Sequence, residues 1–190
     1  LGVTNAILYA NLGSAYASAG EALEAENNFL KALSQKPGDP DILLNLARLC
    51  EAQKEFKSAI QHYQTLAVLN PDDSSVKRSL AYCYHMNRDF LKAAKLFEEL
   101  GQKNDPIAFC NAAGAYIQAG ELDKAETILK PLLEGSLKLP RAYLHQAEIL
   151  RLRKDYLQAE IQYQKALVLN SKDSQISLGL GQLYMEIPDL

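Results

Sequence analysis

The sequence predicts an all-α protein made of antiparallel helix pairs, and three observations lead to this fold class. Apolar residues recur at i, i+3, i+4 and i+7, as in Leu43, Leu46, Ala47 and Cys50, which is the spacing of one helix face. The same pattern of small and large residues returns every 34 residues, and Gly or Pro interrupts it at regular points. Because no segment alternates apolar and polar residues, we expect no sheet.

The chain divides into five full repeats and a partial sixth. These span residues 6–39, 40–73, 74–105, 106–139, 140–173 and, in part, 174–186. Each full repeat holds two helices, and Gly20 and Gly120 separate the helices of the first and fourth repeats. Pro-containing segments, such as residues 36–40, separate one repeat from the next. Each second helix carries a small residue where we expect it to cross the first helix closely. These residues are Ala25, Ala59, Ala93, Ala125 and Ala159.

The repeated residues resemble the tetratricopeptide repeat. In the first repeat the matching residues are Leu12, Gly13, Tyr16, Gly20, Ala25, Phe29, Ala32 and Pro37. The resemblance implies a right-handed α-solenoid, or superhelix, in which stacked helix pairs supply the burial that one repeat lacks. We therefore expect residues 1–190 to form a single solenoid domain of five full repeats and a partial sixth.

Composition argues against several classes of protein. The 20 Lys and Arg residues and 23 Asp and Glu residues give a net charge of −3 without a basic block, which argues against a nucleic-acid partner. The longest apolar run, residues 6–10, is far too short to enter a bilayer. Three cysteines, Cys50, Cys83 and Cys110, cannot form a complete disulfide framework, which favours a cytoplasmic location. The chain begins at Leu1, so we expect a fragment of a longer protein.

The sequence contains no pattern typical of an enzyme site. His62, His85 and His145 lack the i, i+4 pairing of a helical metal site, and the isolated glycines form no phosphate loop. We therefore predict no catalytic residue, no metal and no cofactor.

The resemblance also implies which residues face a ligand: the second, fifth, ninth, twelfth and thirteenth positions of each first helix. These 25 positions hold four of the six arginines and none of the 14 lysines. Arginine binds carboxylates through two parallel hydrogen bonds, so one hypothesis is a partner segment with acidic groups. The alternative is that these arginines pair with Asp41, Glu51 and Glu148 on the same face.

A column of asparagines occupies the sixth position of the first helices. Asn11, Asn45 and Asn111 each offer a donor and an acceptor, which match one peptide unit of an extended chain. This column is similar to the asparagine ladder in the repeat domain of O-linked N-acetylglucosamine transferase. The carboxylate clamp of co-chaperones matches poorly. The candidate partner-binding residues are Asn11, Leu44, Asn45, Arg48, Arg78, Tyr82, His85, Asn111, Arg141, His145 and Arg151.

The leading hypothesis for function is a non-catalytic scaffold that binds a peptide or partner-protein segment in a concave groove within a larger assembly. One alternative is a structural module that self-associates through residues 174–186, where Ile176, Leu180, Leu183 and Tyr184 would present an apolar face. Another is the substrate-recruiting arm of a larger enzyme. An RNA-binding helical-repeat protein fits the acidic charge poorly.

Overall fold

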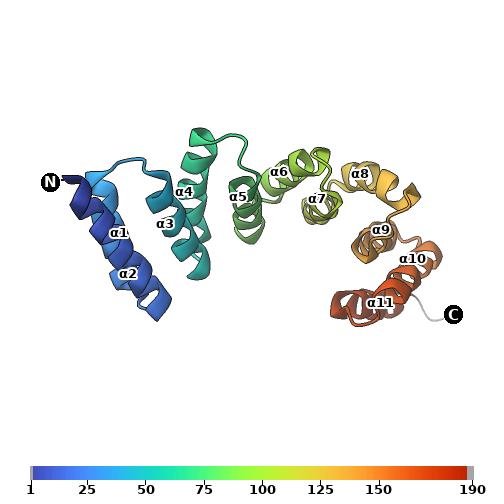
Figure 1. Cartoon of the computed structure of the whole chain (residues 1–190). Helices are drawn as coiled ribbons and strands as arrows, with labels where there is room; N and C mark the ends of the chain where they lie inside the picture. Colours follow the sequence, from blue (N-terminus) through green and yellow to red (C-terminus); the bar gives the residue numbers. More distant parts are fainter. Residues whose placement is uncertain (1, 188–190) are drawn as a thin grey trace. The chain divides into compact units, whose positions relative to one another are not determined.

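A computed structural model describes residues 2–187 and the side chains of residues 5–187. Eleven α-helices and no strand occupy this part of the chain (Figure 1). The helices are α1 (Gly2–Ala19), α2 (Ala22–Gln35), α3 (Pro40–Ala52), α4 (Phe56–Leu69), α5 (Ser74–Met86), α6 (Phe90–Gln102), α7 (Pro106–Gln118), α8 (Leu122–Glu134), α9 (Pro140–Leu152), α10 (Tyr156–Leu169) and α11 (Ser174–Glu186).

Odd-numbered helices are the first helices of the repeats, and even-numbered helices are the second helices. The predicted starts of the second to sixth repeats coincide with the first residues of α3, α5, α7, α9 and α11. Local chemistry sets these starts. Pro40 stands in the first turn of α3, where a missing N–H has no cost, and Asp39 accepts hydrogen bonds from the N–H groups of Asp41 and Ile42.

The turn between the two helices of each full repeat contains one residue in the left-handed region. These residues are Gly20, Lys54, Arg88, Gly120 and Lys154, with φ between 62° and 80°. Gly adopts this conformation without strain, whereas Lys and Arg adopt it at some cost. The same turn is therefore built five times, although only two of the repeats have the residue best suited to it.

The chain forms two compact units, which are described separately. The first unit, Leu1–Asp89, contains α1–α5. In it, α1 packs on α2, α3 packs on α4, and the consecutive pairs α2–α3 and α4–α5 also touch. The boundary falls inside the third repeat, between its two helices. A single repeat domain over residues 1–190 stays a prediction.

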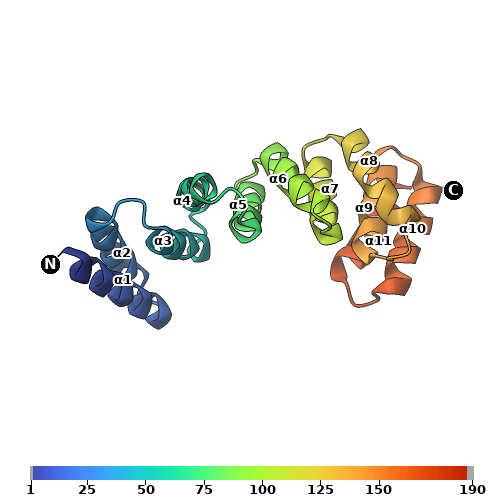
Figure 2. The ribbon, with the colours of Figure 1, turned by 45° about the horizontal axis from the view of Figure 1, so that its top comes forward.

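The second unit, Phe90–Leu190, contains α6–α11. Here α9 packs against α8 and α10, and it also touches the first helices α7 and α11 (Figure 2). A cluster of buried side chains at this end joins α9, α10 and α11, with Leu144, Tyr163, Ile176 and Leu183 at its centre.

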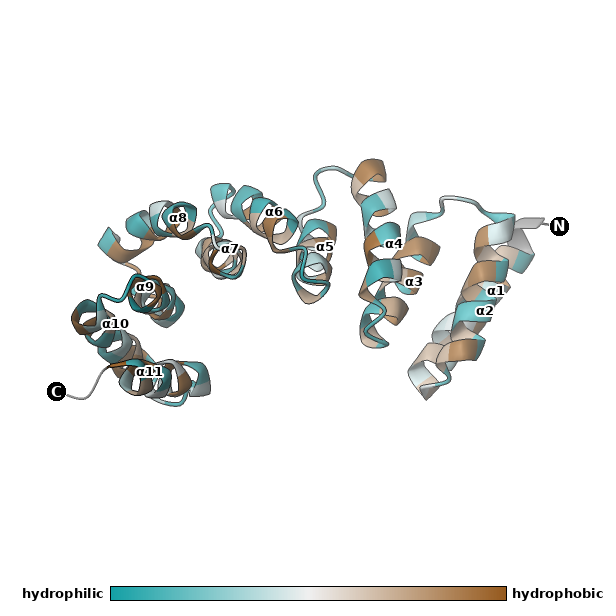
Figure 3. Ribbon diagram, turned by 180° about the vertical axis from the view of Figure 1, so that it is seen from behind, coloured by the Kyte–Doolittle hydropathy of each residue, from teal (hydrophilic) through white to brown (hydrophobic). Residues whose placement is uncertain are grey.

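Small buried residues allow the close helix crossings that the sequence predicts. All five predicted alanines, Ala25, Ala59, Ala93, Ala125 and Ala159, have no exposed surface. Larger side chains, such as Phe29 and Tyr63, are also buried in the same helices. Hydrophobic and hydrophilic residues share most helices, which is the pattern of a helix with one buried face (Figure 3).

Candidate functional site

In the first unit, α3 presents three of the candidate partner-binding residues. Leu44 and Asn45 are half-buried, and Arg48 is exposed one turn after Leu44. Arg48 makes no hydrogen bond or ion pair with any residue that the structure describes. On α1, Asn11 is exposed. Thus α3 combines an apolar side chain, an amide and an unpaired cation within two helical turns.

On α5, the candidate residues differ in their surroundings. Arg78 is exposed, and the ring of Tyr82 meets the ring of Phe56 edge-on, with 6.3 Å between centroids. Tyr82 keeps 43% of its surface exposed despite this contact. His85 is half-buried, and burial lowers the pKa of its imidazole, which favours the neutral ring at pH 7.

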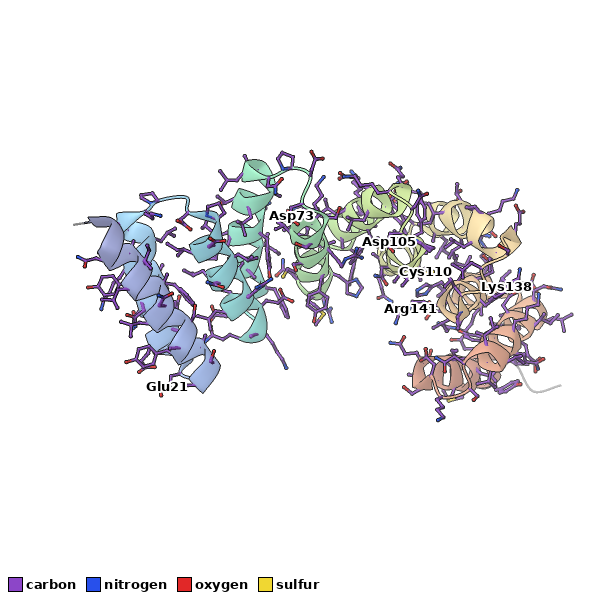
Figure 4. The ribbon with its side chains drawn as sticks, in the orientation of Figure 1. Glu21, Asp73, Asp105, Cys110, Lys138 and Arg141 are labelled. Atoms are coloured by element: carbon purple, nitrogen blue, oxygen red, sulfur yellow. The ribbon has the colours of Figure 1, made fainter. Side chains whose placement is uncertain are left out.

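In the second unit, the structure brings two candidate residues together. Nη1 of Arg141 on α9 donates a 3.2 Å hydrogen bond to Oδ1 of Asn111 on α7. Arg141 is exposed, Asn111 is half-buried, and Cys110 beside Asn111 is buried (Figure 4). Because the partner of Arg141 is a neutral amide, the guanidinium keeps its positive charge uncompensated at the surface.

His145 lies one turn after Arg141 on α9 and packs across α7. Its Nδ1 lies 2.9 Å from Oε2 of Glu148, and its side chain is only 13% exposed. A Cβ at Gly114 on α7 would lie 3.0 Å from Cε1 of His145, so the ring rests on the glycine backbone. His145 therefore packs between α7 and α9, and it also makes a polar contact with Glu148.

Arg151 is not a free cation. Its Nη1 forms an ion pair with Oε1 of Glu186 on α11, and its side chain is 17% exposed. Burial disfavours the charge of Arg151, but Tyr163 and Glu186 raise the pKa of the guanidinium. Glu186 was not among the residues predicted from the sequence. The same register extended to α11 places it at the thirteenth position, which is the signal that could have found it.

The alternative pairing of the arginines with Asp41, Glu51 and Glu148 is wrong for Arg48, Arg141 and Arg151. The carboxylate of Glu51 instead accepts a 2.7 Å hydrogen bond from the hydroxyl of Tyr63. Glu148 faces His145. Arg48 and Arg141 are consequently displayed without a carboxylate partner among the described residues.

The sixth position of the first helices lies at the contact with the preceding repeat. Ser79 on α5 lies beside the hydroxyl of Tyr63 on α4, and Gly179 on α11 lies against Tyr163 on α10. At these two sites the residue at the sixth position therefore meets a buried tyrosine of the preceding repeat. The equivalent residues of the repeats before Asn45 and Asn111 are Phe29 and Phe97, so the role of the asparagine column stays a prediction.

The described residues show no assembled metal site and no membrane-spanning helix. Within them, no three His, Cys, Asp or Glu side chains gather closely enough to hold a metal ion. None of the helices α1–α11 is both long and apolar enough to cross a bilayer. Burial raises the pKa of Cys50 and Cys110 to about 11 and that of Cys83 to about 12, so these thiols are weak nucleophiles at pH 7.

One curated protein with a related sequence is the general transcriptional corepressor ssn6 of Schizosaccharomyces pombe. It is 25% identical over 107 residues, which are 54% of this chain and 10% of that protein. The chain thus spans about a tenth of the length of this relative.

Two solved structures have a similar fold. The MamA protein has a TM-score of 0.75 and 18% identity, with 98% of each chain covered. YrrB, described as a TPR protein with an unusual peptide-binding site, has a TM-score of 0.73 and 15% identity, with 91% of this chain and 90% of that chain covered. With the eleven described helices, these similarities confirm the predicted all-α solenoid fold.

Two family models match the sequence itself. Both are models of the tetratricopeptide repeat, and they match residues 16–83 and 110–175. These matches cover more than two thirds of the chain, and they contain the hydrogen-bonded Asn111 and Arg141 as well as Arg48. The chain belongs to the tetratricopeptide repeat family.

Proposed function

We propose that this chain is a non-catalytic scaffold that binds an extended peptide, or a segment of a partner protein, through the first helices of its repeats. Tetratricopeptide repeat proteins generally bind protein or peptide partners. The first helices display Arg48 and Arg141, neither of which has a carboxylate partner among the described residues. The scaffold acts in the cytoplasm, which the three free cysteines support.

The observation that carries the proposal is the state of Arg141. Its guanidinium is exposed and is oriented by Asn111, and no carboxylate of the described residues neutralises it. A cation that is already oriented loses little entropy when it binds an anion. An Asp or Glu side chain, or a terminal carboxylate, of a partner would complete this site.

Arg48 repeats the chemistry in the first unit. It is exposed and unpaired, and the half-buried Leu44 and Asn45 lie next to it on α3. These groups suit a segment in which an acidic residue is close to an apolar residue, because each finds a complementary side chain within one or two turns of α3.

The test begins with capture of partners from extracts of the native source and their quantification by mass spectrometry. A synthetic peptide from the captured partner is then titrated calorimetrically against the wild type and against the variants Arg48→Ala, Arg141→Ala and Arg141→Lys. We expect Arg141→Ala to lower the affinity about tenfold to hundredfold, because a charge-assisted hydrogen bond is worth about 1.5–3 kcal/mol. The Lys variant should recover only part of this, because lysine lacks the planar fork.

Arg88→Ala is the matched control. Arg88 is an exposed arginine in the turn between α5 and α6, outside the inner-face positions of the first helices. Its replacement should leave the affinity unchanged. Unchanged affinity in Arg48→Ala and Arg141→Ala, with normal circular dichroism, would contradict the proposal.

A second candidate function is self-association through residues 174–186. The apolar face expected on α11 is wrong for Ile176 and Leu183, which are fully buried, but Leu178, Tyr184 and Met185 are 63%, 52% and 80% exposed. Sedimentation equilibrium of the wild type and of a Leu178→Ser, Met185→Ser double variant tests this candidate. A mass that rises with concentration only in the wild type supports it, and a constant monomer mass overturns it. A role as the substrate-recruiting arm of a larger enzyme stays a prediction.

A further inference from the structure

Helix α10 is apolar on two faces, which distinguishes it from its neighbour α8. Ala159, Tyr163 and Ala166 form its buried face. On its other side Leu157, Ile161, Val168 and Leu169 are 69%, 37%, 86% and 43% exposed. By contrast, the exposed side of α8 carries Asp123, Lys124, Thr127 and Lys130. A helix that is apolar on opposite faces is normally covered on both of them.

The exposed side of α10 borders a hollow of about 450 Å³, within the range of ligand sites. Tyr143 from the first turn of α9 and Ile161, Val168 and Leu169 from α10 form its apolar lining. A second hollow of about 770 Å³ shares Tyr143 and extends along α9 to α8. The two hollows together form a groove between the second helices α8 and α10, with α9 as its floor; we call it the outer groove.

The smaller hollow contains two cations and no carboxylate. Its charged lining residues are Lys138 and Lys165. Nζ of Lys138, in the loop between α8 and α9 (Figure 4), is held by the backbone oxygens of Gly135 at 2.9 Å and Leu133 at 3.4 Å. Lys165 makes no hydrogen bond or ion pair with any residue that the structure describes. Neither lysine therefore has its charge neutralised by an acidic group of the described chain. The larger hollow also contains Lys130 and the carboxylates of Glu126, which pairs with Arg153, and Glu134, so the smaller hollow is the part of the groove without an acidic group.

We propose that the outer groove is a second docking site, independent of the first-helix surface, for a short amphipathic segment of an acidic partner protein. The segment places a large apolar side chain against Tyr143, Ile161 and Val168. An adjacent Asp or Glu carboxylate meets Lys138 and Lys165. Charge complementarity selects this occupant, because the apolar lining alone would accept any hydrophobic side chain. The concave shape favours a peptide over a flat bilayer surface, which could not enter the hollow.

The test uses three labelled helical peptides of about four turns, roughly 14 residues, with one leucine stripe and a polar face made of Glu, Gln or Lys. Fluorescence anisotropy with the whole chain measures their affinities at low and moderate salt. We expect the Glu peptide to bind about tenfold more tightly than the Lys peptide, with the Gln peptide between them, and the difference to shrink as salt rises.

Variants locate the binding. Lys138→Glu with Lys165→Glu should weaken binding of the Glu peptide about tenfold and strengthen that of the Lys peptide. Lys165→Glu alone should act in the same direction, and this single variant keeps the hydrogen bonds that Lys138 makes to the backbone. Val168→Ser with Ile161→Ser should weaken all three peptides. The matched control, Lys57→Glu with Lys95→Glu, reverses two exposed lysines on α4 and α6 and should change nothing.

Arg141→Ala separates this proposal from the proposed function. Binding of the Glu peptide in the outer groove should persist in Arg141→Ala and weaken in the Lys138/Lys165 variant, whereas binding at the first-helix surface should show the reverse. Equal affinities for the three peptides, or an unaltered affinity in Lys165→Glu and in the Lys138/Lys165 variant, would overturn the proposal. It would also be overturned if phosphatidylserine vesicles bound the wild type but not the Lys138/Lys165 variant while no peptide bound, since this face would then serve a membrane surface.

Discussion

The hydroxyl of Tyr63 on α4 donates a 2.7 Å hydrogen bond to Oε2 of Glu51 on α3. Three repeats later the same two positions hold Tyr163 on α10 and Arg151 on α9. There the tyrosine hydroxyl is buried beside Arg151 without an acceptor for its proton, and Arg151 pairs with Glu186. Because the residue at this position is a base rather than an acid, Tyr163 lacks the acceptor that Tyr63 has.

This difference predicts that the same Tyr→Phe substitution changes the free energy of unfolding differently at the two positions. Tyr63→Phe removes a donor from a partly buried carboxylate, so we expect it to lower the free energy of unfolding by about 1–3 kcal/mol. Tyr163→Phe removes a hydroxyl that satisfies no acceptor, so we expect a change within about 0.5 kcal/mol, or a small gain. Urea unfolding followed by circular dichroism measures both. Equal losses in the two variants would show that Tyr163 has a hydrogen bond after all.

The helix starts were predictable because the signals are local. Pro40 and Asp39 determine where α3 begins without any contribution from distant residues, and Asp73 acts in the same way for α5. The ion pair between Arg151 and Glu186 was not predictable in this way. It joins two residues that are 35 positions apart in sequence, and it depends on which rotamers the packing leaves open.

The candidate site was predicted in part for the same reason. The repeat register alone puts Asn111 and Arg141 on first helices of consecutive repeats. It does not reveal that they share a hydrogen bond, or that Arg141 lacks an acidic partner. The outer groove was missed because its lysines lie outside the inner-face positions. Its lining combines the loop between α8 and α9 with residues of α8, α9 and α10, and periodicity carries no information about such a loop.

Two glycines in α11 form a matched pair for a test of packing. A Cβ at Gly179 would lie 2.6 Å from Cε1 of Tyr163, whereas a Cβ at Gly181 would meet nothing within 4 Å. Gly179→Ala must displace a fully buried ring, so we expect a loss of about 1–3 kcal/mol. Gly181→Ala should stabilise α11 by about 0.5–1 kcal/mol, because alanine is the better helix former. Thermal and urea unfolding of both variants measure the difference, and a Gly179→Ala variant as stable as the wild type would contradict the close approach.

The aspartate at the start of α5 predicts a pH-dependent contribution to stability. Oδ1 of Asp73 accepts hydrogen bonds from the hydroxyl of Ser75 and from the N–H groups of Val76 and Ser75, and these bonds hold the pKa of Asp73 below its ordinary value. At neutral pH, Asp73→Ala should cost about 0.5–2 kcal/mol. Because the pKa is lower in the folded state, this contribution is present above about pH 4 and is lost as pH falls through the folded pKa.

Glu55 supplies the control for this prediction. It occupies the equivalent capping position of α4, but its side chain makes no capping hydrogen bond. Glu55→Ala should therefore change the stability by only a few tenths of a kcal/mol, within the range of ordinary surface substitutions. Urea midpoints at about pH 7 and about pH 3 test both variants. A cost of Asp73→Ala that stays constant down to the lower pH would exclude the carboxylate as its source.

Two half-buried histidines predict a second, separate pH effect. Burial lowers the pKa of His62 on α4, against an opposing influence of Glu26, and burial also lowers the pKa of His85 on α5. In the unfolded chain both rings take up a proton near pH 6.5. The unfolded state therefore binds more protons between the folded and unfolded pKa values. Stability is complete above about pH 6.5 and falls as pH decreases through this window.

The wild type should unfold at lower urea concentration at about pH 5.5 than at about pH 7.5, and a His62→Gln, His85→Gln double variant should lose less over the same interval. Proton NMR titration of the two rings checks the cause directly, since ring pKa values at or above 6.5 in the folded protein would remove the basis of the prediction.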